Sequence, residues 1–329
     1  MYSELRKHPR LNLADQIPLD YPLTIYVETT NRCNFRCKFC PESLEDYERR
    51  SGGWSTMTLD SFKKICDQVQ LLTGGKRIKT MNFYMMGEPL LNKDILRMTK
   101  YAKNKDLAER LILTTNGSLL HTKQAGEFIG SGLDYIRISI YGANQSVHEY
   151  VTRSRSKLDN IRRAAIGIRE LRKEKKEDKP FIYIKMLDMG EKENAMFRNM
   201  FEGAGDEIAI EPRMDWNGSP ENFSGIERDD LISSEYFGLK KVVCPYPFYT
   251  LVINSDLSVS VCCVDWERKL VVGNLNNETL TDIWKGEKLR RLQNAHLAGK
   301  RESIEGCKDC LYLHTAPDNI DARLGTILE

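Results

Sequence analysis

The chain has 329 residues, 41% of them hydrophobic, and a net charge of +2 from 49 basic and 47 acidic side chains. This near balance of charge gives no electrostatic reason to expect a nucleic acid or an anionic membrane as partner. No apolar run reaches about 18 residues and the polar N-terminal stretch lacks a secretion signal, so we expect a cytoplasmic protein without membrane spans.

Strand-like and helical patterns alternate along the first two thirds of the chain. We predict strands over 23–28, 80–85, 110–114, 135–140, 181–186 and 207–211, and helices over 58–73, 92–106, 121–130, 157–176 and 191–202. This alternation predicts an α/β fold of parallel βαβ units, either a doubly wound sheet or an incomplete barrel. Reactive groups in such folds gather beyond the C-terminal ends of the strands.

A change of pattern follows the sixth strand. Glycine, serine and proline interrupt residues 215–235, a hairpin is predicted over 250–254 and 258–262, and a helix over 280–298. We therefore divide the chain into an N-terminal extension (1–20), a barrel domain (21–215), a linker (216–243), a small second domain (244–315) and a C-terminal tail (316–329).

Three cysteines directly after the first strand form the pattern C-x3-C-x2-C, at Cys33, Cys37 and Cys40. Clustered cysteines in a cytosolic chain are more often metal ligands than disulfides. Three thiolates at this spacing can hold three irons of a cubane cluster and leave the fourth iron open to a small molecule. The alternative is zinc, but structural zinc sites usually have four closed ligands.

With the aromatic Phe39 before its last cysteine, this motif resembles the signature of the radical S-adenosylmethionine (SAM) superfamily. The resemblance covers residues 20–215, with a second block to about 315. It implies a partial (β/α)6 TIM-type barrel and a SAM-binding [4Fe–4S] cluster on the three cysteines. It also implies reductive cleavage of SAM to a 5′-deoxyadenosyl radical, which abstracts hydrogen from a substrate.

Further residues match the family's SAM site. Gly87 and Glu88 lie in a Met-Gly-Glu-Pro segment that resembles the Gly-Gly-Glu-Pro segment meeting the SAM ammonium, with methionine in place of the first glycine. Ser139 matches a serine that contacts the amino-acid or ribose part of SAM, and Arg153 an arginine that pairs with its carboxylate. Asn116, in Thr-Asn-Gly after the third strand, either shapes the pocket floor or belongs to a simple strand-to-helix turn.

The second cysteine set is Cys244, Cys262, Cys307 and Cys310, spaced C-x17-C, x44, C-x2-C. Spacing alone allows zinc or a four-cysteine iron–sulfur cluster. Downstream of such a barrel, the set resembles the shortened SPASM domain called Twitch, which holds one auxiliary [4Fe–4S] cluster. The neighbouring Cys263 is expected to point to the opposite face of the same strand, so we predict that it packs in the core. The alternative is that Cys263 replaces Cys262 as a ligand.

This layout is similar to that of the Twitch-type 2-deoxy-scyllo-inosamine dehydrogenases, which oxidise a ring secondary alcohol. The resemblance implies a small polar substrate such as a sugar or aminocyclitol, an auxiliary cluster that accepts the second electron, and flavodoxin or ferredoxin as electron donor. Glu211 and Arg213, at the barrel mouth, are the catalytic candidates. The alternatives are a peptide-modifying maturase, a redox-neutral sugar epimerase and a zinc-bound interaction module without chemistry.

Overall fold

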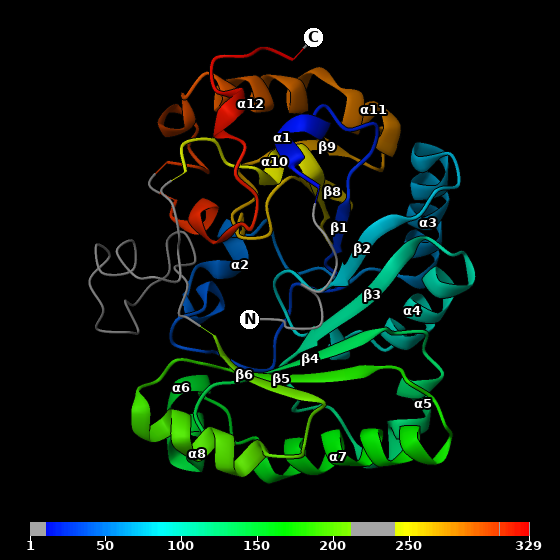
Figure 1. Cartoon of the computed structure of the whole chain (residues 1–329), viewed down its shortest axis with the longest axis vertical. Coiled ribbons are helices and arrows are strands. Elements are labelled where there is room, and N and C mark those ends of the chain that lie inside the picture. Colours follow the sequence, from blue (N-terminus) through cyan, green and yellow to red (C-terminus); the bar gives the residue numbers. More distant parts are fainter. Residues whose placement is uncertain (1–10, 212–240, 309, 329) are drawn as a thin grey trace.

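A single nine-stranded sheet organises the computed structural model, which describes residues 11–211, 241–308 and 310–328 (Figure 1). The strand order is β6-β5-β4-β3-β2-β1-β7-β8-β9. Neighbouring strands from β6 through β1 to β7 pair in parallel, and β8 pairs antiparallel with both β7 and β9. The strands are β1 (Thr24–Val27), β2 (Ile78–Phe83), β3 (Ala108–Thr115), β4 (Tyr135–Ile140), β5 (Phe181–Leu187), β6 (Glu207–Glu211), β7 (Thr250–Ile253), β8 (Ser258–Ser260) and β9 (Val271–Asn274). The sheet is open, which confirms the predicted incomplete barrel.

Helices cover the outer face of the parallel strands (Figure 1). They are α3 (Leu59–Thr73), α4 (Ile95–Asn104), α5 (Ala125–Ile129), α7 (Leu158–Glu174) and α8 (Glu191–Phe201), close to the predicted positions. The sequence patterns missed α1 (Leu13–Gln16), α2 (Tyr47–Arg50), α6 (Gln145–Thr152), α10 (Tyr246–Tyr249) and β9, because each is short. The predicted helix 280–298 is in fact two, α11 (Leu280–Lys285) and α12 (Glu287–Leu297), because Gly286 between them is extended.

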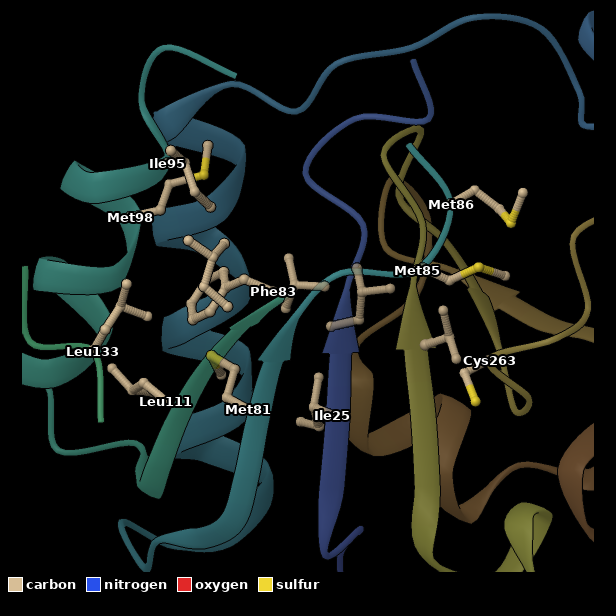
Figure 2. Close-up of a cluster of buried hydrophobic side chains, with 14 of the residues drawn as sticks. Ile25, Met81, Phe83, Met85, Met86, Ile95, Met98, Leu111, Leu133 and Cys263 are labelled. Atoms are coloured by element: carbon tan, nitrogen blue, oxygen red, sulfur yellow. The ribbon is translucent and has the colours of Figure 1, made fainter. Parts of the chain in front are cut away.

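Alternation along the strands separates a dry outer face from a polar inner face. In β4 the side chains of Ile136, Ile138 and Ile140 are fully buried, whereas Arg137 and Ser139 lie on the opposite face. Figure 2 shows part of the outer core, in which strand residues such as Phe83 pack against helical residues such as Met98. The inner face is therefore where polar chemistry is possible.

The C-terminal strands extend the sheet of the barrel, since β7 pairs in parallel with β1 over its whole length. Just beyond β1, the buried Glu28 carboxylate accepts hydrogen bonds from the backbone and hydroxyl of Ser255 at 3.0 and 2.8 Å, and from Arg268 at 3.0 Å. Most of the expected linker, residues 216–240, lies outside the described residues. The two cysteine-bearing parts are thus joined through β1.

None of the helices in the described parts of the chain combines the length and apolar character needed to cross a lipid bilayer.

Candidate active site and auxiliary cysteine pocket

The three predicted cluster cysteines lie together in the loop that follows β1. Cys37 is buried, and Cys33 and Cys40 are half-buried. The Cys40 amide donates to the Cys37 carbonyl at 2.9 Å, which turns the loop back on itself. Burial raises the pKa of all three thiols, and the Glu42 carboxylate adds to this effect. Bound iron would reverse it, because a coordinating metal ion deprotonates a thiol.

Helix α6 supports this loop from outside. The amides of Arg36 and Lys38 donate to the carbonyls of Thr152 and Val151, each at 3.0 Å. The buried Phe35 ring meets His148 edge-on, with centroids 5.8 Å apart. Backbone hydrogen bonds and this ring contact therefore fasten the loop to α6. Sequence periodicity did not reveal this support.

Gly87 joins the SAM-site segment to the cysteine loop. Its φ is +79°, and a Cβ atom there would lie 2.2 Å from the Thr30 carbonyl oxygen, so only glycine fits. The Gly87 amide donates to Glu42 at 2.6 Å. Burial raises the pKa of Glu42 to about 8. Glu42 was not among the predicted site residues, although it lies only two positions after Cys40.

Glu88 is 1% exposed and accepts hydrogen bonds inside the protein. Its carboxylate binds the Leu90 amide at 3.0 Å, the Thr115 hydroxyl at 2.7 Å and the Asn116 amide at 2.7 Å. Burial, partly offset by these donors, raises the pKa of Glu88 to about 7. Glu88 thus fixes the turns after β2 and β3 to each other; its contact with SAM remains a prediction.

Asn116 reaches the cysteine loop. Its side-chain amide nitrogen donates to the side-chain oxygen of Asn34 at 2.9 Å and lies 3.8 Å from the Cys33 sulfur. Its own carbonyl oxygen accepts from Ser118 at 2.9 and 2.6 Å. The Thr-Asn-Gly turn therefore borders the three-cysteine site, and is more than a strand connection.

The remaining predicted SAM residues surround the same loop. Ser139 is buried at the end of β4 and shares a hydrogen bond with Tyr141, whose ring lies 4.8 Å from that of Phe39. Arg153 is exposed and ends α6 in a left-handed conformation, with φ of +51°. The predicted SAM contacts thus lie on loops, at the end of β4 and at the end of α6, on the side where the parallel strands end.

A buried charged group occupies the inner face of β4, β5 and β6. Lys185 contacts Glu211 at 2.6 Å, the Tyr183 hydroxyl donates to Glu211 at 3.0 Å, and Arg137 lies 3.6 Å from it. Burial alone would raise the pKa of Glu211, but Lys185 and Arg137 lower it to about 2. Burial, with Arg137, lowers the pKa of Lys185. We call these four residues the lumen cluster.

Of the two catalytic candidates from the sequence, Glu211 is in the lumen cluster, and Arg213 lies outside the described residues. Lys185 was missed, although a signal was present. In β5, Tyr183 and Lys185 alternate with isoleucines, which places both on the inner face. Lys185 is in register with Ser139 on the adjacent strand.

The second cysteine set lines one pocket in the C-terminal part of the chain. Cys244, Cys262, Cys307 and Cys310 all border it, together with Tyr246, Leu270, Arg301 and Tyr312. Arg301 donates to the carbonyls of Cys307 and Cys310 at 2.6 and 3.1 Å. Burial raises the pKa of Cys244, Cys262 and Cys307. Four sulfurs in an otherwise largely apolar pocket fit an iron–sulfur cluster.

Cys263 is buried elsewhere, and Figure 2 draws it among the core side chains. Its sulfur lies 3.5 Å from the Tyr312 hydroxyl and shares a hydrogen bond with Tyr26. Tyr26 in turn meets Tyr84 edge-on at 5.4 Å. Cys263 thus packs among tyrosines and does not border the four-cysteine pocket; β8 ends at Ser260, before both cysteines, so the turn after the strand and not strand alternation sets their directions.

Comparison with protein families agrees with this geometry. The profile of the Radical SAM superfamily matches residues 27–191, half of the chain. The chain belongs to the radical SAM superfamily. A second profile, for the SPASM iron–sulfur cluster-binding domain, matches residues 244–311. As a radical SAM enzyme with a SPASM domain, the protein uses SAM, a SAM-binding [4Fe–4S] cluster and auxiliary iron–sulfur chemistry.

Individual relatives of this radical SAM enzyme differ in sequence identity and in the share of the chain that they match. The S-adenosyl-L-methionine-dependent 2-deoxy-scyllo-inosamine dehydrogenase of Niallia circulans is 22% identical over 87% of this chain and 91% of its own length. The PqqA peptide cyclase of Bradyrhizobium diazoefficiens is 28% identical, but the match covers 40% of this chain and 31% of the cyclase. The crystal structure of BtrN in complex with AdoMet and 2-DOIA superposes with a TM-score of 0.57 at 18% identity, over 87% of this chain and 92% of BtrN. That structural likeness shows the shared fold.

Proposed function

We propose that this radical SAM enzyme oxidises a secondary alcohol on a small polar substrate, a sugar or aminocyclitol. The observation that carries the proposal is the four-cysteine pocket. One of its cysteines, Cys262, follows the β7–β8 hairpin, and β7 pairs directly with β1, the strand that leads into the SAM-cluster loop. Alcohol oxidation releases two electrons, and a second cluster is useful as an acceptor. The dehydrogenase of Niallia circulans, matched over nearly its whole length, supports this choice.

In this proposal Cys33, Cys37 and Cys40 hold the SAM-binding cluster, and Cys244, Cys262, Cys307 and Cys310 hold the auxiliary one. SAM and its cluster supply the radical chemistry when bound. Gly87 brings the backbone close to the SAM ammonium, Ser139 contacts the amino-acid or ribose part, and Arg153 pairs with the carboxylate. Asn116, Phe39 and Glu88 shape that pocket from three different loops.

The lumen cluster is the proposed substrate site, because it lies on the inner face close to Ser139. Oxidation of an alcohol requires a group that takes the hydroxyl proton. Glu211 is a poor acceptor, because its pKa is about 2. Lys185 is the better candidate, because burial and Arg137 lower the pKa of its amine, against the opposing effect of Glu211, which orients that amine at 2.6 Å. Arg213 stays a second candidate.

The test is anaerobic incubation with SAM, dithionite and 2-deoxy-scyllo-inosamine, followed by mass spectrometry. We expect a ketone two hydrogens lighter, formed in a 1:1 ratio with 5′-deoxyadenosine. Deuterium at the oxidised carbon should appear in the 5′-deoxyadenosine. If SAM is cleaved but this and related cyclitols and sugars are recovered unchanged, the alcohol-oxidation proposal is wrong.

The second candidate is a peptide-modifying enzyme, which the match to the PqqA peptide cyclases favours. That match is confined to a third of the cyclase, so it supports the shared SAM chemistry more than the substrate. If the enzyme modifies peptides, all cyclitols should be recovered unchanged, and SAM cleavage should accompany modification of a ribosomal peptide. The same mass-spectrometric assay, with peptides added, separates the two candidates.

A further inference from the structure

A basic surface surrounds the three-cysteine loop. Residues 31–40 and 150–158 contain six cationic side chains and no aspartate or glutamate. Two backbone hydrogen bonds, from Arg36 and Lys38 to the end of α6, bring these segments together. We call the six cations the basic rim; they are Arg32, Arg36, Lys38, Arg153, Arg155 and Lys157.

The rim points to solvent. All of its side chains are exposed except that of Lys38, which is half-buried. The Lys38 ammonium lies 3.5 Å from the centroid of the Tyr150 ring, and Tyr150 is itself 64% exposed. On the other side of the loop, Trp54 holds the guanidinium groups of Arg32 and Arg36 at 5.2 and 5.9 Å from its ring. These aromatic contacts fix the cations in place without neutralising them.

Few carboxylates offset the rim. Among the described residues, Glu149 pairs with Lys157 at 2.9 Å and the buried Glu42 lies 3.7 Å from Arg36. The segment that follows the loop carries the exposed Glu45 and Glu48, neither of which pairs with a rim residue in the described part of the chain, and Asp46, which pairs with Arg49 of α2 at 2.8 Å. The positive charge is therefore local, since the chain as a whole carries only +2.

Reductive cleavage of SAM consumes one electron from outside the chain. The donor loses one electron, and that electron breaks the carbon–sulfur bond of the SAM sulfonium to give methionine and the 5′-deoxyadenosyl radical. Electron transfer slows steeply with distance, so a donor must come close to the cysteine loop. A dense positive surface at that position attracts a negatively charged protein and orients its approach.

We propose that the basic rim is the docking surface for a small acidic electron-transfer protein that carries a flavin or an iron–sulfur cluster. This inference rests on membership of the radical SAM superfamily and not on alcohol oxidation. Its assay is SAM cleavage to 5′-deoxyadenosine, which needs no substrate. Failure of the dehydrogenase proposal would therefore leave it intact.

The test compares two reductants on the reconstituted full-length enzyme. One is dithionite, a small molecule that needs no docking, and the other is reduced flavodoxin, with a reduced ferredoxin as second protein donor. The variant K38E/R155E reverses two rim charges outside the proposed SAM contacts. We expect its rate constant with protein donors to fall at least about tenfold at low salt, with the dithionite rate and iron content unchanged.

Two controls accompany this variant. K38Q/R155Q removes half as much charge and should give an intermediate loss. K100E/K288E makes the same charge change at exposed lysines on α4 and α12, far from α6 in Figure 1, and should keep the wild-type rate within about twofold. Raising ionic strength to about 200 mM should slow the wild-type enzyme more than K38E/R155E, because screening weakens the attraction.

Several results would overturn the proposal. One is an unchanged rate of K38E/R155E with both protein donors, and another is an equal loss in K100E/K288E. A parallel loss with dithionite would show that the variant damages the SAM site itself. Failure of both protein donors to support wild-type cleavage, while dithionite does, would also reject docking of this kind of partner.

Discussion

At the scale of single residues, Gly87 has both a backbone angle and surroundings that exclude a side chain. Gly75 offers a matched comparison, because its φ is also +79° but nothing lies within 4 Å of its Cβ position. The two glycines therefore separate backbone strain from steric overlap.

We predict that G75A costs only about 1–2 kcal/mol of backbone strain and leaves SAM binding unchanged. G87A adds the clash with the Thr30 carbonyl, so it should displace the Met-Gly-Glu-Pro turn and weaken SAM binding at least about tenfold, or about 1.4 kcal/mol. Equilibrium dialysis with labelled SAM and thermal unfolding of both variants measure the two effects. Equal SAM affinity in the two variants would contradict the role given to Gly87.

Lys185 and Glu211 are a buried ion pair, each about one-eighth exposed at 12% and 13%. Removing one partner of such a pair leaves the other charge uncompensated. We predict that E211Q lowers the free energy of unfolding by about 3 kcal/mol, and that K185M/E211Q loses less than the two single variants together. Anaerobic denaturant unfolding tests this cycle; strictly additive losses would show that the pair is not coupled.

At the scale of elements, the segment after β8 separates two adjacent cysteines by function. Cys262 borders the four-cysteine pocket, whereas Cys263 packs against Tyr312 and Tyr26. C262A and C263A are therefore a matched pair of variants at adjacent positions of the same turn.

We expect wild-type protein to hold about eight irons, from two four-iron clusters. C262A should fall to about four irons and keep uncoupled SAM cleavage, whereas C263A should keep about eight. Iron and sulfide analysis with Mössbauer spectroscopy after anaerobic reconstitution gives the counts. The reverse result would make Cys263 the ligand, and unchanged iron in both would remove the auxiliary cluster from this pocket. Replacing Cys33, Cys37 and Cys40 together should abolish SAM cleavage and spare the second cluster.

At the scale of the whole molecule, the C-terminal part shares the sheet of the barrel. The β1–β7 pairing and the contacts of Glu28 with Ser255 and Arg268 cross the boundary between the two family domains. Without β7, strand β1 would present an unpaired edge.

We therefore predict that the enzyme unfolds as one cooperative unit. Far-ultraviolet circular dichroism reports mainly the barrel helices. In a W54F/W216F variant the remaining tryptophans, Trp266 and Trp284, both lie in the C-terminal part, so their fluorescence reports that part. The two signals should give the same denaturation midpoint. Two separate midpoints would show that the C-terminal part folds independently, and R268M would then have no effect on the barrel transition.

The sequence by itself determined the chemistry and the order of elements. Cysteine spacing and the Gly-Glu motif are local, and the alternation of strands and helices follows from side-chain periodicity, so six strands and their parallel arrangement were predicted correctly. Strand alternation predicted that Cys262 and Cys263 point in different directions; β8 ends at Ser260, so it is the turn after this strand that places Cys262 at the pocket and Cys263 away from it.

Only the tertiary structure decided how distant segments meet. The β1–β7 pairing joins residues more than 220 positions apart along the chain, and the lumen cluster draws one residue or more from each of three strands. The basic rim needs α6, a helix too short to show a clear period, to bring its arginines beside the cysteine loop. Such contacts depend on sheet order and on burial, which raises or lowers a pKa only after the chain has folded.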